Sequence, residues 1–241
     1  MESNFKISTL DGKMIYGKFR GPTEQTLVVF VHGLGGRMDQ HIYYNGARFL
    51  EKHNISSFRF NLYSWEKDGR NLSDCTIETH SSDLDMVINH FRQQGVKKIF
   101  VIGHSFGGPA ILLSKNKDFN GVIFWDPSYA KPLSFEDTEY VECLDMYKGK
   151  WEFEILFNKK MVEEGKTLKE REEVAIQDIK VPIKIITAGN GFLIGGGKRY
   201  FELANEPKEH VIIEGAGHSF DEGGIEEKLF KETLSWINKY S

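Results

Sequence analysis

A serine flanked by glycines is the feature that most constrains how this chain folds. The motif Gly103-His104-Ser105-Phe106-Gly107 follows an apolar run at 97–102 that predicts a buried strand. Residues 109–114 follow it and predict a helix, with Pro109 in the first turn. A tight turn between strand and helix strains the serine backbone and exposes the hydroxyl, provided that small residues flank it. The alternative is an ordinary glycine-rich turn with an incidental serine.

The composition fits one globular domain. The chain has 241 residues, 40% of them hydrophobic and 27% charged, and a formal net charge of −4. This mild, mixed charge does not indicate a basic surface that binds nucleic acid. The N-terminus lacks the apolar core of a signal peptide, and no run approaches the roughly 20 apolar residues that span a bilayer. We therefore expect a cytoplasmic protein that binds neither nucleic acid nor membrane, with Cys75 and Cys143 as reduced thiols.

A second glycine-rich motif, His32-Gly33-Leu34-Gly35-Gly36, ends the apolar strand predicted at 26–31. A phosphate-binding loop is the alternative, but the motif has neither the G-x-G-x-x-G spacing nor a G-K-[ST] ending. Glycines let a backbone N–H face an open cavity. We therefore predict an oxyanion loop, with the N–H groups of Leu34 and Phe106 as its two donors and His32 shaping the loop.

Strands and helices alternate along most of the chain after an opening hairpin around Asp11-Gly12. This alternation predicts an α/β fold with a doubly wound, mostly parallel sheet and helices on both faces. Residues 127–180 interrupt it. They are rich in charge and aromatic residues, with helical patches at 138–147 and 153–164. We predict that 127–180 forms a cap or lid inserted into a core of residues 1–126 and 181–241. The alternative is a solvent-exposed insertion that has its own small core and does not cover the site.

His218 is the strongest candidate for a catalytic base. Nucleophilic catalysis by serine needs a base, and a further group that orients the base. His218 lies in the glycine-rich loop 215–220 after the last predicted strand, on the same expected sheet edge as Ser105. Asp126 ends another strand at this edge, before a proline, where open α/β sheets bind ligands. His104, next to the serine, is interpreted as a packing residue.

The order and spacing of the three glycine-rich motifs resemble those of the α/β-hydrolase superfamily, in its small esterase and acyl-hydrolase branch. The resemblance covers nearly the whole chain. It implies that Ser105 is the nucleophile, His218 the base, and Leu34 and Phe106 the oxyanion donors. It implies neither a metal nor an organic cofactor.

The position of the acid that orients the histidine departs from the pattern of the superfamily. Most members of the superfamily carry it in a turn that corresponds to residues 188–191, where this chain has Gly191 in its place. Some members carry the acid one strand earlier, at the position of Asp126. We therefore predict Asp126 as the orienting acid. The alternatives are Asn190 as a neutral orienting group, or a water molecule in the acid's place.

The sequence thus predicts a serine hydrolase that cleaves small acyl or aryl carboxylic esters through an acyl-enzyme, with a small-molecule ester as its partner. The same residues also suit a thioesterase, an amidase or an acyltransferase. The missing acid at Gly191 keeps open a hydrolase-fold protein that binds a ligand without turnover. The natural substrate and the oligomeric state are left open.

Overall fold

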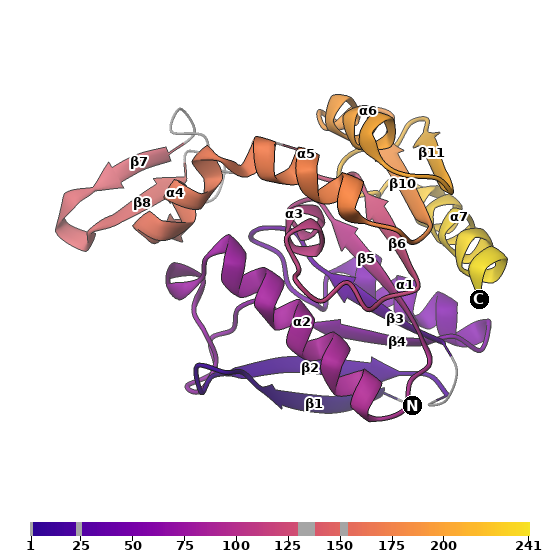
Figure 1. Cartoon of the computed structure of the whole chain (residues 1–241), viewed down its shortest axis with the longest axis horizontal. Coiled ribbons are helices and arrows are strands. Elements are labelled where there is room, and N and C mark those ends of the chain that lie inside the picture. Colours follow the sequence, from indigo (N-terminus) through magenta and orange to yellow (C-terminus); the bar gives the residue numbers. More distant parts are fainter. Residues whose placement is uncertain (1, 23–25, 130–137, 150–153) are drawn as a thin grey trace.

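The computed structural model describes residues 2–22, 26–129, 138–149 and 154–241. Eight of the described strands form one sheet, in the order β1-β2-β4-β3-β5-β6-β10-β11 (Figure 1). β1, β2 and β4 pair antiparallel, and every other pairing in this sheet is parallel. The predicted opening hairpin and mostly parallel sheet are confirmed. The strands are β1 Glu2–Ser8, β2 Met14–Arg20, β3 Thr26–Val31, β4 Ser56–Phe60, β5 Lys98–His104, β6 Gly121–Trp125, β10 Ile183–Ala188 and β11 Lys208–Ile213.

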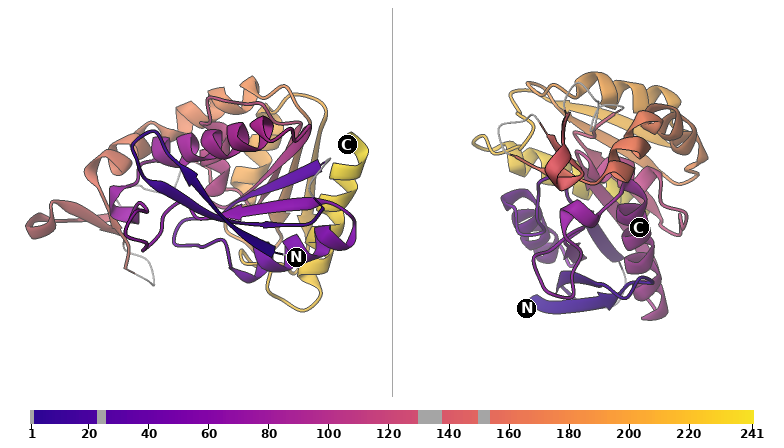
Figure 2. Two further views of the ribbon diagram at one scale, coloured as in Figure 1. Left: turned by 90° about the horizontal axis from the view of Figure 1, so that it is seen from below. Right: turned by 90° about the vertical axis from the view of Figure 1, so that its left-hand side faces the viewer.

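Helices cover both faces of the sheet (Figure 2). Alternate residues of β3 face opposite sides: Leu27, Val29 and Val31 join the core beneath α2, α3, α5 and α6, while Val28 and Phe30 join the core beneath α1 and α7. Because both faces are covered, the central strands are apolar throughout rather than alternating. The helices are α1 His41–Lys52, α2 Ile77–Gln93, α3 Gly107–Leu112, α4 Lys159–Lys166, α5 Leu168–Asp178, α6 Ile194–Leu203 and α7 Ile225–Tyr240.

The helix predicted at 138–147 is wrong. This segment forms β7 Thr138–Val141 and β8 Met146–Gly149, joined by a single 3₁₀ turn at Glu142–Leu144 and by Asp145 at φ +53°. Tyr140 and Tyr147 face each other across the two strands, with ring centroids 5.3 Å apart. Such cross-strand aromatic pairs stabilise a hairpin, which outweighs the weak helical spacing of the segment. The hairpin extends away from the body of the domain (Figures 1 and 2).

The second predicted helix, at 153–164, begins too early. Its first residue, Phe153, lies outside the described residues. The chain then forms the short strand β9 Leu156–Phe157, which pairs with β8, before α4 begins. Asn158 caps α4 by accepting a hydrogen bond from the Met161 N–H at 2.8 Å. This cap fixes where the helix starts.

A third hydrophobic cluster joins α4 and β9 to the end of the sheet. Its buried residues are Cys75, Ile77, Phe106, Ile155, Phe157, Met161, Val162 and Leu168. Glu164 reinforces the contact, because its Oε2 accepts from the N–H groups of Ile77 (2.7 Å) and Glu78 (3.2 Å) at the start of α2. α5 begins in this cluster with Leu168, and the rest of the helix packs with α3 and α6 in the main core. That 127–180 acts as a cap stays a prediction. Nowhere in the described chain is there a helix long and apolar enough to cross a membrane.

Candidate active site

Ser105 lies in the turn between β5 and α3, at the carboxyl end of the sheet. Its φ is +53°, a left-handed conformation that is unfavourable for any residue except glycine. The turn is possible because the flanking residues lack side chains. A Cβ on Gly107 would lie 2.2 Å from the Val31 carbonyl oxygen, and one on Gly103 would lie 2.8 Å from the Gly107 carbonyl oxygen. The two glycines predicted to be necessary are therefore required by close backbone contact.

The Ser105 hydroxyl has a neighbour that the sequence did not reveal. Its Oγ lies 3.3 Å from the Oγ of Ser128, a buried residue just beyond β6. The Ser128 N–H also donates to the Ser105 carbonyl (3.0 Å), and the Tyr200 hydroxyl donates to the Ser128 carbonyl (2.8 Å). Ser128 is therefore held in place from both ends. Within the described residues, no hydrogen bond joins Ser105 Oγ to His218.

The predicted oxyanion loop lies against Ser105. A Cβ on Gly33 would be only 3.0 Å from the Ser105 Cβ. Among the described residues, the N–H groups of Leu34 and Phe106 donate to no protein acceptor. Buried or half-buried N–H groups normally have partners, so two neighbouring N–H groups without one are suited to receive a ligand oxygen.

His32 fixes the shape of this loop. Its Nδ1–H donates to the Gly33 carbonyl at 2.8 Å, and its Nε2 accepts from the Leu62 N–H at 3.0 Å. This pattern requires the neutral ring with its proton on Nδ1. Burial lowers the pKa of His32 to about 4, so the ring stays neutral at physiological pH.

His218 and Asp126 meet at the same edge of the sheet. The Nδ1–H of His218 donates to Asp126 Oδ2 at 2.6 Å. Asp126 is fully buried, and its Oδ1 accepts from the Ala188 N–H at 3.1 Å. Asn190, the alternative orienting residue, is exposed, and its side chain makes no hydrogen bond to His218 in the described structure. A Cβ on Gly191 would lie 3.0 Å from Asp126 Oδ2, so the two positions considered for the acid share one space.

His104 is buried among aromatic rings, as expected of a packing residue, and it also makes hydrogen bonds that the sequence did not reveal. Its ring stacks on His218 with centroids 4.7 Å apart, and its Nε2–H donates to the His218 carbonyl at 2.9 Å. Its Nδ1 therefore accepts from the Tyr43 hydroxyl (2.9 Å), which in turn accepts from the Gly33 N–H (3.2 Å). Burial lowers the pKa of His104 to about 3, which keeps this tautomer neutral. His104 thus connects the loop of His218 to the oxyanion loop.

At this edge the described residues offer neither a metal site nor a reactive thiol. In the described chain, no group of three or more His, Cys, Asp and Glu side chains is arranged to hold a metal ion. Cys75 is buried, and burial raises its thiol pKa to about 12, so it is a poor nucleophile. The arrangement provides a serine on a strained turn, a histidine with a buried carboxylate partner, and two free N–H groups.

Comparison with known proteins agrees with this geometry. A family model described as "Alpha/beta hydrolase family" matches residues 28–164. The chain is similar to Est1E from Butyrivibrio proteoclasticus, solved with ferulic acid bound, with a TM-score of 0.80 and 16% identity over 97% of this chain and 99% of that one. It is also similar to the alpha/beta hydrolase GrgF from Penicillium sp. sh18 (TM-score 0.78, 16% identity, 100% and 99% covered).

A third similar structure is the monoacylglycerol lipase of Paleococcus ferrophilus (TM-score 0.73, 17% identity, 94% and 99% covered). No curated protein sequence matches the chain significantly. At these identities the structural similarity establishes a shared fold.

Proposed function

Because this chain belongs to the alpha/beta hydrolase family, we propose that it is a serine hydrolase that cleaves carboxylic esters of small acyl or aryl groups through an acyl-enzyme. The observation that carries this proposal is the 2.6 Å contact between His218 Nδ1 and Asp126 Oδ2, at the sheet edge where Ser105 lies half-buried on its strained turn. Esterases and a lipase among the structural neighbours support the choice of an ester. A cytoplasmic location remains part of the proposal.

Each proposed role follows from the position of the group. Asp126 keeps the proton of His218 on Nδ1, which leaves Nε2 as the base. Nε2 takes the Ser105 proton as Oγ attacks the ester carbonyl carbon, and the oxyanion formed accepts from the N–H groups of Leu34 and Phe106. Collapse of this intermediate expels the alcohol, which takes the proton from His218. Water then attacks the acyl-enzyme in the same manner and releases the acid.

Labelling with a serine-directed fluorophosphonate tests the mechanism without assuming a substrate. We expect one label per chain, on Ser105, and loss of labelling when the protein is first heat-denatured. The competing possibility is a folded protein that binds ligands without turnover, which would remain unlabelled. Thioester, amide or acyl-transfer chemistry would use the same nucleophile, and product analysis with a competing alcohol would distinguish acyl transfer.

Ser128→Ala should lower kcat for p-nitrophenyl acetate about 3- to 10-fold and change KM less than twofold. The Ser128 hydroxyl lies beside Ser105 Oγ and can donate to this oxygen as negative charge develops on it during attack. Ser128→Thr, which keeps the hydroxyl, is the control and should retain most of the activity. Equal activity of Ser128→Ala and wild type would show that this contact plays no part in the reaction.

A further inference from the structure

A cavity of about 360 Å³ opens beside the oxyanion loop. Its walls come from that loop, from the segment that follows β4, from the turn at Leu72–Asp74 and from β9. Gly35 and Arg37 form the side nearest the oxyanion loop, and Tyr63, Trp65 and Ile155 supply much of the apolar surface. A mainly apolar cavity with a small number of polar or charged groups is the usual form of a small-molecule site.

This cavity lies close to the proposed nucleophile. Gly33 contacts Ser105. Gly35 follows Gly33 by two residues, so the Cα atoms of Gly33 and Gly35 are at most about 7.6 Å apart. Ile155 also belongs to the third hydrophobic cluster, which contains Phe106, and Tyr63 and Leu72 pack against that cluster. A substrate whose carbonyl oxygen meets the Leu34 and Phe106 N–H groups can therefore extend past Gly35 into the cavity.

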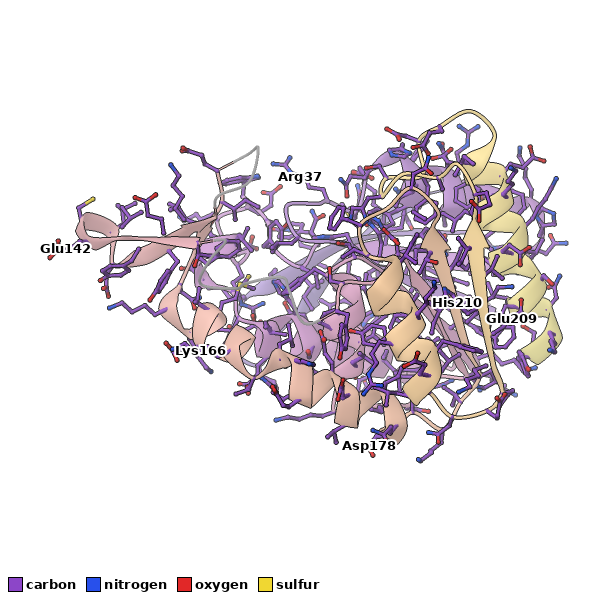
Figure 3. All side chains as sticks on the ribbon, turned by 90° about the horizontal axis from the view of Figure 1, so that it is seen from above. Arg37, Glu142, Lys166, Asp178, Glu209 and His210 are labelled. Atoms are coloured by element: carbon purple, nitrogen blue, oxygen red, sulfur yellow. The ribbon has the colours of Figure 1, made fainter. Side chains whose placement is uncertain are left out.

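Arg37 gives the cavity a positive charge. The side chain is exposed, and it lies at the surface of the body of the domain, at the upper centre of Figure 3. Its Cζ lies 5.8 Å from the centroid of the Trp65 ring, and Trp65 is itself 81% exposed. Within the described chain, no carboxylate forms an ion pair with Arg37; the acid on the cavity wall, Glu154, pairs instead with Lys148 at 2.5 Å.

We propose that this cavity binds a carboxylate at the far end of the ester substrate, held by the guanidinium of Arg37. The inference rests on the proposed function. The substrate class is then the half-esters of dicarboxylic acids and related esters that carry one distal carboxylate. The planar guanidinium fork matches a carboxylate through two parallel N–H···O bonds, and the Trp65 ring orients it.

The surrounding charges favour a singly charged carboxylate over a doubly charged phosphate. Two further cations, Lys6 and Lys18, line the adjoining cavity, but each has a carboxylate partner. Lys6 lies 3.8 Å from Asp68, and Lys18 lies 2.8 Å from Asp39. Arg37 is therefore the one unpaired cation of the described residues around these two cavities, and a single carboxylate neutralises it.

Paired substrates test this inference. We would compare mono-p-nitrophenyl adipate, pimelate and suberate with the same compounds carrying a methyl ester in place of the free carboxylate. Wild type should favour the free acid of at least one chain length about 10-fold or more in kcat/KM. Arg37→Met should reduce this preference at least 10-fold, and Arg37→Lys should retain part of it. The chain length with the largest preference measures the distance from Ser105 to Arg37.

Arg48→Met is the matched control. Arg48 is an exposed arginine that also lies over an aromatic ring, Tyr44, at 5.7 Å, but it lines neither cavity. Its removal should leave the preference unchanged. Wild type without preference for the free acid, or Arg37→Met with the wild-type preference, would overturn the inference while leaving the proposed function intact. Failure to hydrolyse either substrate series would instead count against the proposed function.

Discussion

Ser105→Ala is expected to lower kcat for p-nitrophenyl acetate by about 10⁵-fold or more and to abolish fluorophosphonate labelling. Removal of the nucleophile eliminates the acyl-enzyme, so the residual rate comes only from binding and the oxyanion donors. Neither serine nor alanine is favoured at φ +53°, so the substitution should change the thermal unfolding midpoint little. Steady-state kinetics and circular dichroism melting on the same preparation separate the two effects.

Ser219→Ala controls for the loss of a hydroxyl near the site. Ser219 follows His218 directly and is exposed, and its removal should change kcat less than twofold. If Ser105→Ala instead keeps a large part of wild-type activity, another residue performs the chemistry, and the proposed mechanism is wrong.

The sequence predicted the parts of this fold that depend on local pattern. Apolar β-branched runs separated by amphipathic helices gave the parallel sheet, because a strand buried on both faces must be apolar along its whole length. The elbow was predictable for a similar reason. Gly103 is required by its contact with Gly107 and Ile111 of α3, and Gly107 by its contact with Val31 of the neighbouring strand. Such contacts recur wherever a strand, a tight turn and a helix follow one another.

The structure of 138–178 could not be predicted in this way. Helix α5 carries five consecutive charged residues at 169–173. Its apolar face is formed by Leu168, which enters the third cluster, and by Ala175 and Ile176, which enter the main core. Helix α6 begins at Ile194, although the next three residues are glycines, which disfavour a helix. Gly197 is necessary there because a Cβ would lie 2.2 Å from Thr187 Cγ2 of the neighbouring strand. In both helices tertiary packing outweighs local propensity.

Two contacts of the candidate site were missed because they join distant parts of the chain. Ser128 lies 23 residues from Ser105, and His104 lies 114 residues from His218. Neither belongs to a motif with fixed spacing. One signal was present in the sequence: Ser128 follows Asp126-Pro127 at the same sheet edge as Ser105, and residues that end neighbouring parallel strands come close in space.

Asp126→Asn should lower kcat about 10³- to 10⁴-fold near neutral pH, with little change in KM. The buried carboxylate stabilises the imidazolium that forms when His218 takes the serine proton, and it holds the proton on Nδ1. An asparagine amide carries no charge and can donate to Nδ1, which favours the wrong tautomer. Asp221→Asn is the matched control, since Asp221 is exposed and close to His218 in sequence; it should stay within twofold of wild type.

Moving the carboxylate to residue 191 tests the same assignment by gain of activity. The Cβ of a residue at 191 would lie 3.0 Å from the present position of Asp126 Oδ2, so the two side chains compete for one space. Asp126→Gly empties that space, and glycine tolerates the φ of +39° at this position. Adding Gly191→Asp to Asp126→Gly should restore activity at least 10-fold, whereas adding Gly191→Asn should not. Near wild-type activity of Asp126→Asn would show that His218 depends on Asn190 or water rather than on a carboxylate. Equal activity of the two double variants would show that a carboxylate at 191 does not replace that of Asp126.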